Sequence, residues 1–585
     1  MNFVSRQKTK SKVVIVGIYM PGIYPAAEDD VVARLLAPSF LKAVADADSE
    51  VVAKYDIEII DIQTTEGIED IAARIVAAEP DVLAYSVYMW NYDQVADSLK
   101  RVREQFPNVR TVFGGPLVTY TPDEVMSEHP DVDIVVRGNG GEIRFKQLLK
   151  GDFSPAALRE IPQISFRDED GALVHTQGEV KEDVSQIPSI YETGVLDLND
   201  GNKHTVFIET FRGCPFSCGY CIWGPEESAI YKFDLDQLCR DIDTIYNNPN
   251  VRAVIFTDAC LFYTKKRAHV ICDHIAKAKY KIPTIFTLDV HVMDEAMCES
   301  LSKVNLYHNQ WHFGIQTTNP KALDLLKRPG GGEPEKYLHK VDLLRDYIPD
   351  AEISFDLIYG LPGDDYAGFR ASTDFVLGLR PGKVHFSPLL LLPGTRFFDQ
   401  RDQLGFVYDD QPPYMVRANE SFPPDEIRKA EDLVLWVMAA LYFPAIRDAL
   451  YELCSRNGLG HIDVIEDWVE RLSKKIDPVS EVKLDFTIEA QNLARRSVMN
   501  ILTQPENAVL CYETMFEVMQ ANNAVDLADD IRLGIDYYKA VGEGKLAPGS
   551  STEFEDARQL VDQGVFSVKD VNKINRVKTV WVTAA

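Results

Sequence analysis

The chain has 585 residues, with 61 Lys or Arg against 90 Asp or Glu, which gives a formal net charge of −29. This acidic balance disfavours non-specific binding to nucleic acid or to an anionic membrane. Hydrophobic residues make up 46% of the chain and charged residues 26%, so wholesale disorder is excluded and the length favours about three to four domains.

The chain begins with a polar and basic stretch, residues 1–12, that has no apolar segment behind it. We therefore expect no secretory signal there. No run of about 18 apolar residues occurs, so we also expect no membrane span. A cytoplasmic location follows as an expectation.

Residues 12–150 alternate short apolar runs with amphipathic stretches. The predicted strands are 13–17, 57–60, 81–85, 111–113 and 133–136, and the predicted helices are 31–45, 68–77 and 92–106. Repeated β–α units predict an α/β fold with a doubly wound, Rossmann-like parallel sheet, which we assign to residues 1–150.

The ligand of such a sheet is expected beyond the carboxyl ends of its strands. Glycine at those ends lets a ligand approach the backbone closely. The residues that we place at the ends are Tyr19, Ser86, Tyr88, Trp90, Gly114, Gly115, Pro116 and Gly138, with simple packing as the alternative for Trp90. No G-x-G-x-x-G follows the first strand and no P-loop is present, so the sequence does not support a nicotinamide or ATP site.

The remaining chain divides into three predicted parts. Residues 151–200 are expected to form a connector with a hairpin of strands 164–167 and 173–175. Strands at 205–208, 253–257, 284–288, 311–316, 353–358 and 383–390 predict a partial (β/α)6 barrel in residues 201–400, with its active face at the strand ends. Amphipathic stretches at 425–451, 462–473 and 524–540 predict a helical domain in residues 401–585.

Three of the nine cysteines, Cys214, Cys218 and Cys221, lie within eight residues directly after the first barrel strand. A closed structural zinc site needs four ligands, and no second Cys or His pair lies nearby. Three thiolates instead suit a 4Fe–4S cluster with one open iron, which needs a reducing compartment. The other six cysteines are scattered, and we expect them to be small buried hydrophobes.

The stretch Glu209-Thr-Phe-Arg-Gly-Cys214-Pro-Phe-Ser-Cys218-Gly-Tyr-Cys221 resembles the CxxxCxxC motif of radical SAM enzymes. Three later stretches resemble motifs of the coproporphyrinogen-oxidase-like branch of that family: Gly314-Ile-Gln316, Phe355-Asp-Leu-Ile-Tyr-Gly-Leu-Pro-Gly363 and Pro393-Gly-Thr395. Four motifs in the right order cover about residues 200 to 400.

The resemblance implies that SAM chelates the open iron through its amino and carboxylate groups. Around it we place Tyr220 and Ile358 near the adenine, Gln316 at the ribose or the amino acid part, and Arg328 at the carboxylate. The alternative for Tyr220, Ile358 and Gln316 is simple packing in the core, and the alternative for Arg328 is a position on the surface. Asp258, which ends the second strand, and Tyr359 are the catalytic candidates. Asp258 could bind SAM or the fourth iron, or it could cap a helix.

The N-terminal domain also resembles a known domain. Tyr85-Ser-Val-Tyr88, Gly114-Gly-Pro116 and Val136-Arg-Gly-Asn-Gly-Gly-Glu142 look like the cobalamin-binding domain that is fused to one large radical SAM subclass. Two departures concern the cofactor contacts: relatives often carry Gly-Glu-Gly-Glu where this chain has residues 138–141, and the Asp-x-His-x-x-Gly cobalt motif is absent.

Residues 1–128 contain no histidine, so the main part of that domain has no imidazole to offer to cobalt. We expect water, Tyr88 or Trp90 at the lower face of the cobalamin. Weak lower ligation would favour reduction to Co(I).

The leading hypothesis is a cobalamin-dependent radical SAM C-methyltransferase that acts on a small molecule, with a tryptophan-like natural-product precursor among the candidates. In the usual scheme one SAM methylates Co(I), and a second SAM gives the 5′-deoxyadenosyl radical that activates the substrate carbon. We expect an electron donor such as flavodoxin or ferredoxin as partner, and neither nucleic acid nor membrane.

Three alternatives remain open. An electron-rich carbon could attack methylcobalamin directly, as in the tryptophan methyltransferases of thiopeptide pathways, and an acidic group near the open iron, for which Asp258 is the candidate, would favour that route. A ring contraction or cyclisation could proceed without methylation. The cluster and the corrinoid could also serve a redox sensor.

Overall fold

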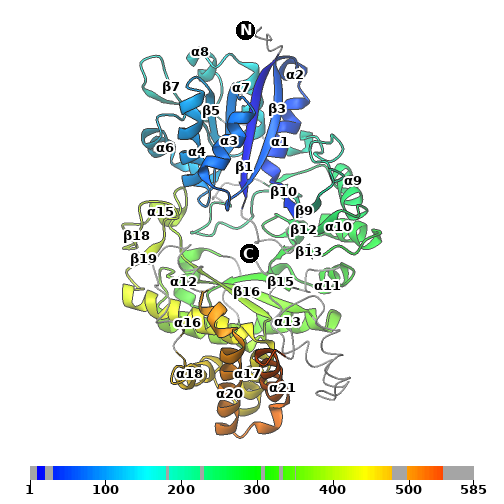
Figure 1. Ribbon diagram of the computed structural model, residues 1–585, viewed down its shortest axis with the longest axis vertical. Helices are drawn as coiled ribbons and strands as arrows, with labels where there is room; N and C mark the ends of the chain where they lie inside the picture. Colours follow the sequence, from blue (N-terminus) through cyan, green and yellow to red (C-terminus); the bar gives the residue numbers. More distant parts are fainter. Residues whose placement is uncertain are drawn as a thin grey trace.

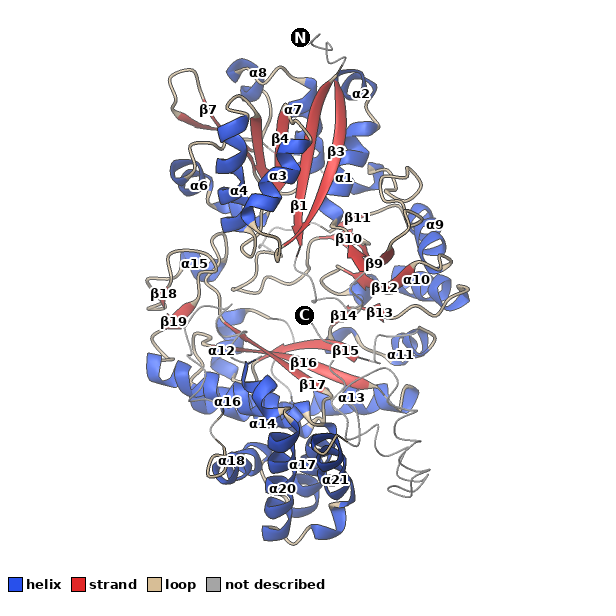
Figure 2. Cartoon of the chain, in the orientation of Figure 1, coloured by secondary structure: helices blue, strands red, loops and turns tan. Residues whose placement is uncertain are grey.

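The computed structural model describes residues 10–19, 31–178, 183–223, 230–304, 310–328, 334–349, 351–476, 478 and 497–544. Residues 1–9 of the basic start lie outside this part of the chain. Along the long axis of the molecule, Figure 1 shows a sheet flanked by helices, then two smaller sheets, then a group of helices. Figure 2 shows the same division by secondary structure.

The N-terminal sheet has seven strands in the order β3-β1-β4-β5-β6-β7-β8. Its parallel part comprises β3 (Tyr55–Gln63), β1 (Ser11–Tyr19), β4 (Val82–Ser86), β5 (Arg110–Gly114) and β6 (Ile134–Val136). On β1, Val14 packs with α3 (Ile68–Ala77) and α4 (Tyr92–Gln105), while Ile15 packs with α1 (Leu36–Asp46) and α7 (Gly141–Lys150). Helices cover both faces, which confirms the predicted doubly wound sheet.

The predicted hairpin is present and belongs to this sheet. Strands β7 (Ile164–Arg167) and β8 (Leu173–His175) continue it in antiparallel pairing from β6. The segment predicted as a connector therefore begins inside the first sheet. Four short helices complete this part: α2 (Ser49–Lys54), α5 (Pro116–Tyr120), α6 (Pro122–Glu128) and α8 (Pro155–Arg159).

The predicted helix at 31–45 is wrong at its start. Residues Val31–Ala33 form the strand β2, and α1 begins only at Leu36. β2 pairs in parallel with β9 (Lys203–Ile208), with Val31 opposite Lys203. Two β-branched valines suit a strand, and the partner that stabilises it lies far along the chain, so no local pattern reveals the pairing.

The predicted barrel strands are all present and form two four-stranded sheets, β13-β12-β9-β2 and β14-β15-β16-β17. Their bounds are β12 (Val251–Phe256), β13 (Thr284–Ile285), β14 (Thr287–Leu288), β15 (Gln310–Gln316), β16 (Glu352–Tyr359) and β17 (Lys383–Pro388). The third predicted strand is broken at Phe286, because β13 pairs with β12 whereas β14 pairs with β15. The helices between the strands are α9 (Leu235–Tyr246), α10 (Lys265–Lys277), α11 (Glu295–Ser302), α12 (Pro320–Leu326), α13 (Pro334–Tyr347) and α14 (Tyr366–Gly378).

The chain after the barrel passes α15 (Arg396–Asp399) and a small hairpin, β18 (Val407–Tyr408) and β19 (Val416–Ala418), and then becomes helical. The predicted helix 425–451 is two helices, α16 (Pro424–Tyr442) and α17 (Pro444–Asn457), because Pro444 lacks the N–H that a continuing helix needs. α18 (His461–Leu472) and α21 (Asp529–Gly542) follow the predictions, and α20 (Pro505–Ala521) was not predicted.

In the described chain, no single helix is both long and apolar enough to cross a membrane. Helices α16 and α17, which are bent by 104° relative to each other, are long and apolar enough only when they are taken together.

Candidate functional site

The three clustered cysteines lie in residues 209–223, here called the cluster loop, which follow the carboxyl end of β9. Cys218 is buried, and Cys214 and Cys221 are partly exposed. Burial first, then the nearby charges of Cys221 and Cys218, raise the pKa of the Cys214 thiol to about 11. The three thiols therefore lie close together and partly away from water. A metal centre that binds them as thiolates would replace their protons and be held there. This donor set fits an iron–sulfur cluster.

The other six cysteines are buried, as predicted, and none of the nine forms a disulfide.

Asp258 fixes the start of the cluster loop. One of its carboxylate oxygens accepts hydrogen bonds from the Thr210 amide at 3.0 Å, the Thr210 hydroxyl at 2.8 Å and the Phe211 amide at 2.9 Å. The other oxygen is buried and has no hydrogen-bond partner among the described residues. Burial raises the pKa of this carboxyl to about 6. Asp258 is therefore first of all a positioning residue for the loop that carries the cysteines.

The helix-capping alternative for Asp258 is wrong, because the short helix after it, Leu261–Thr264, has no side-chain cap. Its role toward SAM or the fourth iron stays a prediction, for which only the second carboxylate oxygen is left.

Arg328 lies beside the cluster loop in a buried ion pair. Its guanidinium donates to the Asp289 carboxylate at 2.7 Å and to the Gly314 carbonyl at 3.0 Å, and the two side chains are 9% and 4% exposed. The nearby Arg328 charge opposes the rise that burial causes in the pKa of the Cys218 thiol. The surface alternative for Arg328 is therefore wrong. Asp289, which follows β14, was not predicted, although an acidic residue at a strand end is a visible signal.

Tyr220, Ile358 and Gln316 lie around the same place. Ile358 belongs to a buried apolar cluster with Leu326, and Tyr220 packs against that cluster. Gln316 sits at a bulge of β15 with φ +72°, a conformation that costs a non-glycine residue energy and often marks a functional site. A Cβ on Gly314 would come within 2.6 Å of the Gln316 amide and 3.2 Å of the Arg328 guanidinium, so both polar groups converge there. Their contacts with SAM stay predictions.

Tyr359 lies away from this group. Its side chain is 1% exposed and packs on Phe369 of α14, with ring centroids 5.8 Å apart. Along β16 the side chains alternate between the two faces, and Tyr359 is on the face that packs against helices. We correct its assignment from catalytic residue to core residue.

The carboxyl ends of β1, β4, β5 and β6, here called the strand-end edge, are shaped by one asparagine. Asn91 donates to the carbonyl of Ser86 at 3.0 Å and accepts from the Tyr88 amide at 2.8 Å. This holds the turn in which Tyr88 and Trp90 stack at 4.3 Å, and Trp90 remains 40% exposed. A flat aromatic pair is thereby presented at the edge where a planar cofactor was predicted. Asn91 was missed as a site residue in the sequence.

Gly115 and Gly138 of the strand-end edge have positive φ angles, a backbone conformation that other residues rarely adopt. Gly115, between Gly114 and Pro116, has φ +123°, and a Cβ there would lie 2.3 Å from the Val87 carbonyl oxygen. Gly138 has φ +68°, and its amide donates to the Thr119 hydroxyl. Tyr19 is occupied by other contacts: it packs on Phe207 of β9 and its hydroxyl accepts from Gln63. The cofactor contacts of these residues stay predictions.

An ion pair whose side chains are 16% and 9% exposed joins the start of α7, next to the strand-end edge, to the cluster loop. Arg212, two residues before Cys214, donates to both oxygens of Glu142 at 2.7 and 3.1 Å and to Glu209 at 3.1 Å. Glu142 stands in the first turn of α7, directly after the glycine-rich residues 138–141. A bidentate guanidinium–carboxylate contact fixes orientation as well as distance. The sequence shows each charge but not the contact between them.

A cleft of about 460 Å³ lies elsewhere, at the amino ends of β16 and β17, where Arg380, Arg447 and Glu452 line it. It holds none of the predicted site residues.

Comparison with protein families gives two matches, one over the N-terminal sheet and one over the barrel. Residues 32–145 match the B12 binding domain, and residues 208–376 match the Radical SAM superfamily.

Among known proteins, the chain is similar to the cobalamin-dependent radical SAM methyltransferase TokK of Streptomyces tokunonensis. The two are 33% identical over 216 residues, 36% of this chain and 31% of TokK. The 2-(S-pantetheinyl)-carbapenam-3-carboxylate methyltransferase of Streptantibioticus cattleyicolor is matched to the same extent. The chain thus covers about a third of the length of these relatives.

Solved structures share the fold over more of the chain. The cobalamin-dependent S-adenosylmethionine radical enzyme OxsB, with aqua-cobalamin and S-adenosylmethionine bound, aligns with a TM-score of 0.56 at 13% identity, over 98% of this chain and 85% of its own. The methyltransferase TsrM of Kitasatospora setae, with tryptophan and a SAM analogue bound, aligns with a TM-score of 0.53 at 15% identity, over 69% and 80%.

Proposed function

We propose that this chain, a member of the cobalamin-dependent radical SAM enzymes, transfers a methyl group from SAM, by way of cobalamin, to a carbon of a small molecule. The observation that carries the proposal is the bidentate contact between Glu142 and Arg212. It brings the loop that begins the helix of the B12 binding domain next to the loop that holds the cysteines. The two cofactors of the proposed reaction would therefore face one space.

The cofactors of this enzyme are a 4Fe–4S cluster, SAM and cobalamin; when bound, they supply the electron, the methyl group and its carrier. The chain positions them. Cys214, Cys218 and Cys221 would ligate the cluster, and Asp258 and Arg212 hold the loop that presents these cysteines.

Arg328 and Gln316 would hold the polar part of SAM, because both converge at Gly314 beside Cys218. Tyr220 and Ile358 would flank its adenine in the apolar cluster that they share. Two groups at one place, one charged and one neutral, suit a ligand that carries both a carboxylate and hydroxyl groups.

The Asp258 carboxylate bears on the choice between the radical route, which we propose, and direct attack on the methyl carrier. Direct attack needs SAM to be kept off the open iron, for which an acidic group near that iron was the candidate. The Asp258 carboxylate is instead bound on one oxygen by Thr210 and Phe211. Its geometry supports a role in holding the loop, and only the second oxygen, which has no hydrogen-bond partner among the described residues, is left for a role at the iron.

The remaining parts of the proposal follow the predicted division of the chain. Residues 1–150 would bind cobalamin, 201–400 would hold the cluster and SAM, 151–200 would connect them, and 401–585 would form a helical C-terminal domain. An electron donor such as flavodoxin or ferredoxin in a reducing cytoplasm would serve the cluster. A tryptophan-like compound is the first substrate to try.

The test is anaerobic reconstitution with iron, sulfide and cobalamin, followed by SAM with a deuterated methyl group, a strong reductant and tryptophan as the probe. We expect S-adenosylhomocysteine, 5′-deoxyadenosine in step with product, and a product that carries the deuterated methyl group. Cys239→Ala, which changes a buried cysteine outside the cluster loop, should leave these yields unchanged.

Other outcomes identify the alternatives. S-adenosylhomocysteine and methylated product without deoxyadenosine would contradict the radical route. Deoxyadenosine with a product that lacks the deuterated methyl would indicate a ring rearrangement or cyclisation. If neither S-adenosylhomocysteine nor 5′-deoxyadenosine forms, with or without tryptophan, the assignment as an enzyme fails and a redox sensor is favoured.

A further inference from the structure

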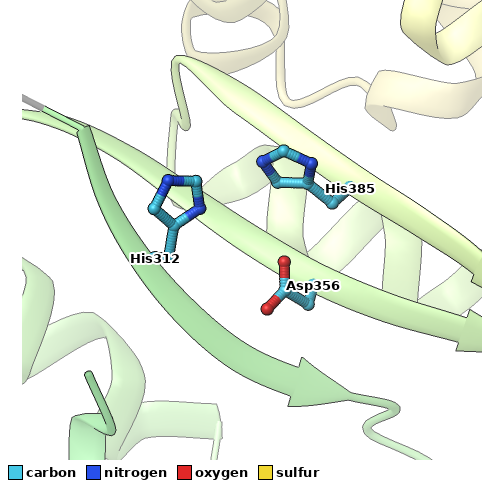
Figure 3. Close-up of side chains that lie close together, drawn as sticks. All are labelled: His312, Asp356 and His385. Atoms are coloured by element: carbon cyan, nitrogen blue, oxygen red, sulfur yellow. The ribbon is translucent and has the colours of Figure 1, made fainter. Parts of the chain in front are cut away.

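Three side chains that no predicted role uses meet inside the barrel: His312 on β15, Asp356 on β16 and His385 on β17, here called the lumen trio. Figure 3 shows them on three neighbouring strands, turned toward one another. One donor atom from each lies within 4.8 Å of the other two. Asp356 and His385 are direct partners in the strand register, and the two imidazole centroids are 5.1 Å apart.

The alternation of the strands shows that this is the inner face. Phe313, Phe355 and Phe386 stand next to the trio in sequence, and all three are buried in the core that packs on the helices. Side chains one position away point to the opposite side of a strand. The trio is only partly buried, so it borders the open interior of the barrel rather than the core.

Hydrogen bonds within the chain do not account for the trio. His312 Nδ1 lies 2.9 Å from the Ser354 hydroxyl, a hydrogen bond that fixes the orientation of the ring. His385 Nε2 is buried and has no hydrogen-bond partner in the described part of the chain. Buried polar atoms are nearly always satisfied, so an unsatisfied nitrogen in a group with a second imidazole and a carboxylate indicates a ligand.

The donor chemistry is that of a transition-metal site. Two imidazoles and one carboxylate are a common ligand set for Zn²⁺ and for non-haem Fe²⁺, and three protein ligands leave a coordination position for another molecule. Imidazole binds metal in its neutral form.

Lys383 opposes a cation here. Lys383 stands two residues before His385 on β17 and therefore on the same face of the strand, so its ammonium charge lies near the trio. The residue is exposed to the interior of the barrel, and its long side chain can turn away when a metal binds. A neutral side chain at this position should therefore strengthen metal binding.

We propose that His312, Asp356 and His385 bind one divalent transition-metal ion of the Zn²⁺ or Fe²⁺ class, with a coordination position left for a heteroatom of the substrate. The metal site stands on the trio alone, whereas its role in holding substrate rests on the proposed function. Asp356 is the register partner of Gly314, where Gln316 and Arg328 converge, so the trio borders the place proposed for SAM. A substrate bound there would be fixed at a heteroatom while its carbon faces SAM and cobalamin.

The test uses the reconstituted holoenzyme, whose cluster occupies the cysteines that would otherwise take up zinc. After dialysis against Zn²⁺ and removal of loosely bound metal, elemental analysis separates zinc from the iron and cobalt of the cofactors. We expect about one zinc ion per chain and, in X-ray absorption, a first shell of nitrogen and oxygen only. His385→Ala and Asp356→Asn should each weaken zinc binding by at least about tenfold, and Lys383→Met should tighten it.

His274→Ala is the matched control, because that histidine is partly exposed on α10 and pairs with Asp243 instead. It should bind zinc as the unchanged protein does. Cluster and corrinoid spectra of every variant show whether it has folded. A holoenzyme that binds no zinc, a sulfur in the first shell, or full binding by folded His385→Ala would each overturn the proposal. Failure of methyl transfer with zinc bound would overturn the proposed function and the substrate role but not the metal site.

Discussion

The cluster loop and the strand-end edge face each other across the Glu142–Arg212 pair, and they are built from different kinds of contact. The cluster loop is held by buried charged side chains, above all Asp258 and the Arg328–Asp289 pair. The strand-end edge is shaped by the backbone, through Gly115, Gly138 and a turn that Asn91 holds. A small reactive metal centre needs fixed charges around it, whereas a large flat cofactor needs room close to the backbone.

This difference predicts which kind of substitution damages each region. Removal of a ligand or a charge should damage the cluster region alone, and addition of a side chain should damage the strand-end edge alone.

The largest effect is expected from Cys218→Ala. Without one of three thiolate ligands the cluster should not assemble, so the iron content should fall from about four per chain to near zero while corrinoid is retained. Iron and sulfide analysis together with the visible spectrum measure both. Cys239→Ala, at a buried position in α9, is the control and should keep its iron. Loss of corrinoid together with iron would break the proposed independence of the two regions.

Arg328→Met comes next. It leaves the Asp289 carboxylate buried without its cation, at a cost of about 3–5 kcal/mol in the free energy of unfolding. Denaturant unfolding should show this loss, and equilibrium binding should show weaker SAM affinity. The double variant Arg328→Met, Asp289→Asn should recover part of the stability but none of the SAM affinity. Recovery of both would mean that the pair is structural only.

Gly115→Ala tests the strand-end edge. The added Cβ would lie 2.3 Å from the Val87 oxygen in a backbone of φ +123°, so we expect a loss of about 1–3 kcal/mol and of corrinoid binding, with the cluster unchanged. Gly141→Ala is the control on the neighbouring loop, because a Cβ there meets nothing within 4 Å. Thermal unfolding and corrinoid content are the measurements. Equal effects of the two substitutions would contradict the close approach at Gly115.

The smallest effect concerns pH. Burial raises the pKa of Glu209 to about 7, although Arg212 opposes the rise. A raised pKa in the folded state favours folding at low pH, so this contribution is full below about 4.5 and is lost as the pH rises through about 7. Glu209→Gln should therefore flatten the fall in Tm between pH 5.5 and 8. Glu192→Gln, at an exposed pair with Arg240, should leave the fall unchanged; an equally steep fall in Glu209→Gln would contradict the assignment.

The sequence predicts most of the fold because the signals are local. Apolar runs and the glycines and prolines that end them place the N-terminal parallel strands and the barrel strands close to where they lie. The split between α16 and α17 had a local signal as well, in Pro444, and could have been predicted. The strand β2 had only a weak local signal, two β-branched valines, because its three residues are stabilised by pairing with β9, far along the chain.

The candidate site divides in the same way. The cysteines follow from spacing, and Gln316 and Ile358 from strand-end motifs. The contacts of Arg212 with Glu142 and of Arg328 with Asp289 join residues far apart in the chain, so the sequence shows the charges without their partners. Tyr359 was misplaced by a single position, since a step of one residue along a strand reverses the face.

The strand β2 also bears on how the molecule can be divided. The chain leaves the N-terminal sheet after β1, adds three residues to the edge of the barrel sheet beside β9, and then returns to the N-terminal sheet. A fragment that begins at residue 201 would lack this edge and expose the backbone groups of β9, which invites aggregation. We therefore expect the N-terminal sheet and the barrel to fail to fold when they are expressed separately. Exchange of the two together between relatives should succeed. The corrinoid and cluster modules are accordingly expected to be inherited together.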